Sequence, residues 1–104
     1  MRVVLDQGTP VPLRYALGQH SVSTAYELGW SNLDNGESLR AAEMQFEVVV
    51  TTDKNLRFQQ NLSGRRLAFI VLPTTNWLEI KRHQAQIAEV VDQIKPGEYR
   101  ELKW

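Results

Sequence analysis

The sequence has no cysteine, and this absence excludes several classes of site at once. Disulfides, thiolate-bound metals, iron–sulfur clusters and cysteine nucleophiles all require that residue. A chain without cysteine fits a reducing compartment, so we expect a cytoplasmic protein. No apolar run approaches the roughly 18 residues of a membrane span, which predicts no membrane contact. The acid at position six stands too early for a signal peptide.

Other familiar catalytic motifs are also missing. The two histidines, His20 and His83, lack ligand-like spacing, and we interpret both as surface or packing residues. Gly8 and Gly64 do not form a phosphate-binding glycine motif, and no serine lies in a nucleophile elbow.

The chain has 104 residues, of which 42% are hydrophobic and 23% charged, as expected for a single globular domain over residues 1–104. Its formal net charge is zero, but the charges are unevenly spread. Residues 1–53 hold seven acids against three arginines, and residues 54–104 hold nine bases against five acids. An acidic cluster beside a basic segment can hold a metal ion next to a phosphate backbone, although solvated faces explain the same pattern.

Strand and helix patterns alternate along the chain. Continuous apolar runs are typical of strands that are covered on both faces. Helices are indicated by caps and by apolar residues that recur every three or four positions. Strands are expected at Arg2–Leu5, at Glu47–Thr51, at Leu67–Leu72 and, as a short polar strand, at Ser21–Thr24. Helices are expected from Pro10 to Gly18 with Thr9 as N-cap, from a capping box at Asp34 to about Gln45, from Leu56 to Leu62, and from Asn76 to Ile94.

This order predicts an α/β fold, a three-layer α/β/α sandwich with a mostly parallel central sheet. Residues 95–104 form a tail that could add an edge strand. The long helix is expected to bury Trp77, Ile80, Ile87 and Val91.

Two acids follow directly after predicted strands. Asp6 comes after Arg2–Leu5, and Asp53 comes after the strand that ends near Thr52. Ligands of parallel sheets bind beyond the carboxyl ends of the strands. Carboxylates at neighbouring strand ends repel one another unless a cation joins them, and their oxygens suit Mg²⁺ or Mn²⁺. The pair therefore predicts a metal site.

Each acid also has a purely structural interpretation. Asp6 could form an Asx turn, Asp53 could cap the following helix, and Glu37 could be the third helical residue of a capping box. Glu43 lies about 40° from the buried Leu39 on ideal helical phase, so it is the fourth candidate ligand.

The segment 54–66 holds four bases and no acid. Bases, amides and an aromatic residue together can follow a single-stranded RNA, and an exposed polar helix is the alternative. The candidate RNA-binding residues are Lys54, Arg57, Arg65 and Arg66.

Three segments resemble the PIN-like superfamily, in particular the short PIN-like proteins of bacterial toxin–antitoxin pairs. Val3–Asp6, followed by Gln7-Gly8-Thr9-Pro10, resembles the opening strand with its acid and proline-bearing turn. Glu37–Ala42 resembles the acid followed by a helix with small residues. Val49–Leu56 resembles the strand that ends in a threonine-x-aspartate motif, which is the most specific of the three.

The resemblance implies a Mg²⁺- or Mn²⁺-dependent ribonuclease with Asp6, Glu37 and Asp53 as catalytic acids. Short relatives often carry further acids where this chain has Gln7 and Asn55. Because a low charge count weakens sites for hard cations, we expect weak metal binding. The implied partners are RNA and a small antitoxin-like protein.

Three hypotheses remain open from the sequence. The first is a toxin-like metal-dependent ribonuclease, the second is a non-catalytic PIN-like module that binds a protein or RNA, and the third is a structural homo-oligomer. Three or four converging acids would favour the nuclease, and two or fewer would favour the binding module.

Overall fold

The computed structural model describes residues 1–30, 36–56 and 64–104. In this part of the chain five strands form one sheet in the order β2-β1-β3-β4-β5, and every neighbouring pair is parallel. The strands are β1 (Arg2–Leu5), β2 (Ser21–Thr24), β3 (Val48–Thr51), β4 (Ala68–Val71) and β5 (Tyr99–Glu101). The helices are η1 (Val11–Leu17, a 3-10 helix), α1 (Gly36–Gln45), α3 (Trp77–Arg82) and α4 (Gln84–Gln93). The prediction of an α/β fold with a parallel sheet is confirmed.

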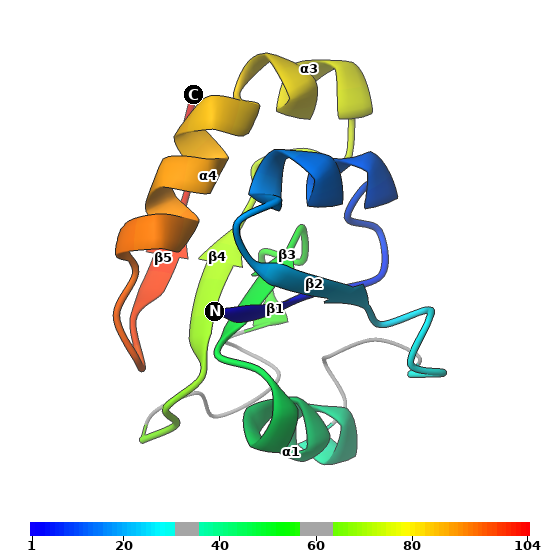
Figure 1. The fold of residues 1–104 in the computed structure, drawn as a ribbon, viewed down its shortest axis with the longest axis vertical. Coiled ribbons are helices and arrows are strands. Elements are labelled where there is room, and N and C mark those ends of the chain that lie inside the picture. Colours follow the sequence, from blue (N-terminus) through cyan, green and yellow to red (C-terminus); the bar gives the residue numbers. More distant parts are fainter. Residues whose placement is uncertain (31–35, 57–63) are drawn as a thin grey trace.

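The central strands are buried because both of their faces are covered. Alternate residues of β1, β3 and β4 enter two separate apolar clusters, as the period of two in a strand requires. One cluster joins Val3, Val50 and Ile70 to η1, α3 and α4, and the other joins Val49 and Phe69 to α1. Figure 1 shows α1 on one side of the sheet and η1, α3 and α4 on the other.

The edge strands agree with the sequence. β2 and β5 are the outer strands, and β5 extends the sheet beside β4 with Ile70 opposite Arg100. The residues expected to form a C-terminal tail therefore complete the sheet. Within the described residues, no helix is long and apolar enough to cross a membrane.

The helix expected from Asn76 to Ile94 is wrong as one element, because the chain forms two helices that meet at His83. In a continuous helix the His83 N–H would donate to the carbonyl of Glu79. Instead it donates to the carbonyl of Ile80, while His83 Nδ1 lies 3.0 Å from the Glu79 carbonyl oxygen. The His83 ring stacks on Trp104 with centroids 4.3 Å apart. The contact of His83 Nδ1 with the Glu79 carbonyl thus takes the place of one helical hydrogen bond. The two helices still bury the expected Ile80, Ile87 and Val91. Trp77, which was also expected to be buried, is only partly buried, because it lies in the first turn of α3.

The expected N-cap at Thr9 is also wrong. The short helix is a 3-10 helix with Pro10 as N-cap, and Gly18 ends it as expected. The Thr9 hydroxyl donates instead to the carbonyl of Val50, which binds the turn after β1 to β3. At Asn76 the expected cap is present, because its Oδ1 accepts the N–H of Glu79. The capping box at Asp34 and most of the helix expected from Leu56 to Leu62 lie outside the described residues.

Candidate metal site at the carboxyl edge of the sheet

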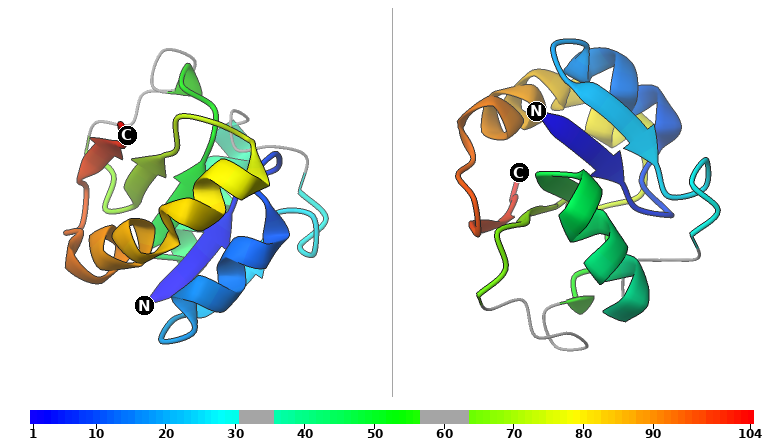
Figure 2. Two further views of the ribbon diagram at one scale, coloured as in Figure 1. Left: turned by 90° about the horizontal axis from the view of Figure 1, so that it is seen from above. Right: turned by 60° about the horizontal axis from the view of Figure 1, so that its bottom comes forward.

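The candidate site lies where the loops after β1, β2 and β3 meet; we call this region the carboxyl edge. β1 and β3 are neighbours, yet the chain leaves β1 towards β2 on one side and continues from β3 towards β4 on the other. This change of direction is a topological switch point, which is where open parallel sheets bind ligands. In Figure 2 the loop after β1 lies between the loops after β2 and β3.

Asp6 is the first residue after β1 and is only 4% exposed. Its backbone N–H continues the sheet by donating to the carbonyl of Val50. Its Oδ1 accepts the N–H of Gln7 at 2.8 Å, and its Oδ2 accepts the hydroxyl of Thr51 at 2.8 Å. A buried carboxylate needs such donors, and these two fix its orientation. The contact with Gln7 is to the next residue and not the one two residues on that an Asx turn uses, and the contact with Thr51 comes from the neighbouring strand.

Thr51 links the two strand-end acids. It is fully buried at the end of β3, donates to Asp6 and accepts the backbone N–H of Asp53 at 3.0 Å. One hydroxyl therefore orients Asp6 and the first turn of the Asp53 loop together. Asp53 Oδ1 accepts the N–H of Asn55 at 2.9 Å, which is an Asx turn. Within the described part of the chain, Oδ2 of Asp53 makes no hydrogen bond and remains available to a ligand.

The turn after β1 is closely packed against the end of β3. Gly8 has a φ of +87°, and a Cβ at this position would lie 3.2 Å from the Thr52 hydroxyl oxygen. Glycine therefore satisfies both the left-handed backbone and the short approach. This packing holds the loops of Asp6 and Asp53 against each other.

Glu37 belongs to the same end of the fold. It lies in the first turn of α1, whose last turn leads into the start of β3 at the opposite edge. Helix α1 is therefore antiparallel to the strands, and its first turn, which carries the exposed Glu37, lies at the carboxyl edge. Within residues 1–30, 36–56 and 64–104, however, no three His, Asp or Glu side chains gather as a metal-binding group. Thr51 joins the Asp6 carboxylate to the backbone of Asp53, and the described residues show no cluster that includes Glu37.

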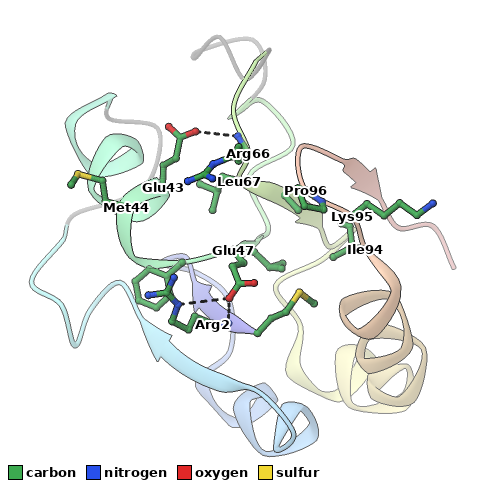
Figure 3. A pocket seen from close by; sticks show the side chains of 13 residues that line it. Arg2, Glu43, Met44, Glu47, Arg66, Leu67, Ile94, Lys95 and Pro96 are labelled. Carbon is green, nitrogen blue, oxygen red and sulfur yellow. Dashed lines mark hydrogen bonds and ion pairs between the residues drawn. The ribbon is translucent and has the colours of Figure 1, made fainter.

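Glu43 is not at this edge. Its carboxylate accepts from the Arg65 guanidinium and from the Arg66 N–H, both at 3.1 Å. It lines a cavity of about 720 Å³ at the amino ends of the strands, beside Arg2 and Glu47 (Figure 3). The suggestion that Glu43 shares a metal with Asp6 is therefore wrong. The helical phase was sound, but α1 carries Glu43 to the opposite end of the sheet.

The candidate RNA-binding bases also lie at two different edges of the sheet. Lys54 is exposed directly after Asp53, at the carboxyl edge. Arg65 and Arg66 precede β4 and therefore lie at the amino edge, where Arg65 is paired with Glu43. Arg57 lies outside the described residues. Of the described members, only Lys54 accompanies the two acids.

The loop after β2 forms the third side of the carboxyl edge. The Thr24 hydroxyl accepts the N–H of Glu27, and Glu27 Oε1 accepts the N–H of Thr24, both at 3.0 Å. This is a capping box that closes a turn. The hydrogen bond from Arg14, followed by those from Thr24, lowers the pKa of Glu27 below its ordinary value of 4.5. Gln7 Nε2 donates to the carbonyl of Trp30 at 3.0 Å and so ties this loop to the loop of Asp6.

Thr51 is the site residue that residue-by-residue reasoning missed. The threonine-x-aspartate pattern was the available signal, but a strand sequence alone does not show which neighbour a buried hydroxyl will meet.

No family model, curated protein or solved structure matches the chain.

Proposed function

We propose that the chain is a PIN-like domain, with a three-layer α/β/α arrangement, that cleaves RNA phosphodiester bonds with a weakly held Mg²⁺ or Mn²⁺ ion. The observation that carries the proposal is the link from Asp6 through the Thr51 hydroxyl to Asp53 at the switch point. Toxin-like action in the cytoplasm and control by a small antitoxin-like protein belong to the same proposal.

The donor set fits a hard cation. Asp6 and Asp53 offer carboxylate oxygens, and Asp53 Oδ2 makes no hydrogen bond within the described residues. Such oxygens suit Mg²⁺ and Mn²⁺, which keep several water ligands. When bound, the ion neutralises phosphate charge and lowers the pKa of a bound water. Glu37 is the third acid of this proposal.

The chain's own residues position and balance the charges. Thr51 and the Gln7 N–H hold the buried Asp6 carboxylate in one orientation before any ligand arrives. Such preorganisation avoids reordering a catalytic group during the reaction. Lys54 places a cation beside Asp53, where it can contact an RNA phosphate.

A second candidate is a PIN-like module that binds a partner without cutting RNA. It is favoured by one specific observation, namely that the described residues contain no cluster of three acids at this edge. Gln7 and Asn55 also offer neutral amides where carboxylates would strengthen metal binding.

An RNA cleavage assay with Mn²⁺ separates the two candidates. The nuclease proposal expects wild type to cleave a single-stranded RNA, Asp6→Asn to lose cleavage, and Glu43→Gln to retain it. The last variant is the matched control, because Glu43 lies at the opposite edge. Wild-type protein that cleaves no RNA in Mn²⁺ or Mg²⁺ would overturn the nuclease proposal in favour of the binding module.

A further inference from the structure

An exposed aromatic side chain stands at the carboxyl edge. Tyr26 lies in the turn after β2 and is 82% exposed. Tyrosine usually buries much of its ring, and an exposed ring in a functional region offers a flat apolar face to a ligand. Tyr26 therefore presents its ring to solvent at the edge where the candidate site lies.

Its turn lies directly beside the turn of Asp6. β1 and β2 are paired with Leu5 opposite Thr24, and the N–H of Ala25 donates to the carbonyl of Leu5 at 2.9 Å. Tyr26 is thus the second residue beyond this pair on β2, as Gln7 is on β1. Neighbouring strands lie about 4.8 Å apart, so a ligand at Asp6 is within reach of the loop that carries Tyr26.

The turn holds the Tyr26 backbone in a fixed position. The capping box of Thr24 and Glu27 closes it, and the N–H of Gly29 donates to the carbonyl of Tyr26 at 3.1 Å. The negative charge of the neighbouring Glu27 is balanced by Arg14, which forms an ion pair with it at 2.9 Å. A rigid aromatic side chain loses little conformational freedom on binding, so a fixed turn favours stacking.

We propose that Tyr26 is a nucleobase-stacking residue, on which an unpaired base of an RNA strand lies while the phosphate backbone passes the acids at Asp6 and Asp53. Every base has a π-face, so stacking on an aromatic ring binds single strands with little sequence preference. Bases inside a duplex are already stacked and cannot use such a ring. This inference rests on the proposed RNA substrate and adds the residue that recognises its unpaired bases.

The test is the affinity for a short single-stranded oligoadenylate RNA, measured by fluorescence anisotropy in EDTA so that cleavage does not interfere. We expect Tyr26→Ala to weaken binding roughly five- to 150-fold, the range of one lost base–aromatic stack. Tyr26→Phe keeps the ring and should bind like wild type. Tyr15→Ala is the matched control, because Tyr15 is 83% exposed but lies on η1, which covers a face of the sheet. It should also bind like wild type.

Two results would overturn the inference. One is a Tyr26→Ala affinity equal to that of wild type, and the other is equal binding of the same strand in a duplex. Because binding is measured without metal, failure here is separable from failure of the proposed nuclease. Cleavage that depends on Asp6 but not on Tyr26 would leave the nuclease and remove the stacking residue. Binding that depends on Tyr26, with no RNA cleavage, would support the stacking residue and remove the proposed nuclease.

Discussion

The hydroxyl of Thr51 donates to Oδ2 of Asp6 over 2.8 Å, so the last residue of β3 orients the first residue after β1. The same hydroxyl accepts the N–H of Asp53. Because Thr51 is completely buried, water cannot replace either contact without a change in structure. One buried side chain therefore contacts both acids, the carboxylate of Asp6 and the backbone of Asp53.

Replacing Thr51 by Val should test that dependence. Valine keeps the shape but leaves Oδ2 of Asp6 without this donor and the Asp53 N–H without its acceptor. We expect the free energy of unfolding to fall by about 1–3 kcal/mol, the cost of unsatisfied buried groups. Urea denaturation measures it. Thr51→Ser, which keeps the hydroxyl, should lose about 0.8 kcal/mol for the missing methyl group. A valine variant more stable than the serine variant would contradict this account.

The core on the η1, α3 and α4 side should be sensitive to Ile87. This residue is fully buried on α4 and packs in the larger apolar cluster. Ile87→Ala should lower the free energy of unfolding by about 2–4 kcal/mol, through lost burial and the cavity left behind. Urea denaturation should show little change for the exposed Glu89→Ala on the same helix. Equal effects at both positions would show that Ile87 is not part of the core.

The elements that carry this core could be foreseen from the sequence, and their ends could not. Apolar runs such as 48–50 and 68–72 required strands covered on both faces, and the expected helix stripe was correct at Ile80, Ile87 and Val91. His83, where the helix breaks, stacks on Trp104, which is far away in the sequence. Periodicity reports only local spacing, so it continued the helix through this position.

The same limit applies to the site. Asp6 and Asp53 could be assigned to one edge, because parallel strands end on the same side. Glu43 was misplaced because helical phase gives a direction around the axis and not a height along the sheet. The basic segment was split for a related reason, since a connection between parallel strands begins at one edge and ends at the other.

Acid should weaken the turn that carries Tyr26. The pKa of Glu27 is lowered in the folded state by Arg14 and then by Thr24, so ionised Glu27 stabilises the fold above its ordinary value of 4.5. This contribution is lost as the pH falls through the lowered pKa. Urea midpoints of wild type and Glu27→Gln should therefore differ at pH 6 and converge in acid. A difference that grows as the pH falls would contradict the assigned direction.

Lys54 should contribute to RNA affinity, and Arg66 should not. Lys54→Gln removes a cation beside Asp53 and should reduce the salt dependence of binding by roughly 0.7 in the log–log slope, the value for one phosphate contact. Arg66→Gln is the matched control, because Arg66 lines the cavity at the amino edge. Filter binding at several salt concentrations gives both slopes. Equal loss in the two variants would mean that RNA also contacts the amino edge.

The metal at the carboxyl edge is the central claim, and thermal melting with and without Mn²⁺ tests it most directly. The comparison uses wild type, Asp6→Asn, Asp53→Asn and, as control, Glu43→Gln. A ligand that binds only the folded state stabilises it by roughly 1–3 kcal/mol at ten to a hundred times its dissociation constant. For the weak site expected here, about 10 mM Mn²⁺ is roughly ten times a millimolar constant.

We predict that Mn²⁺ raises the melting temperature of wild type and of Glu43→Gln, and that Asp6→Asn and Asp53→Asn both lose this increase. A wild-type melting temperature unchanged by Mn²⁺, with both asparagine variants more stable than wild type, would contradict the account. The two acids would then only repel each other.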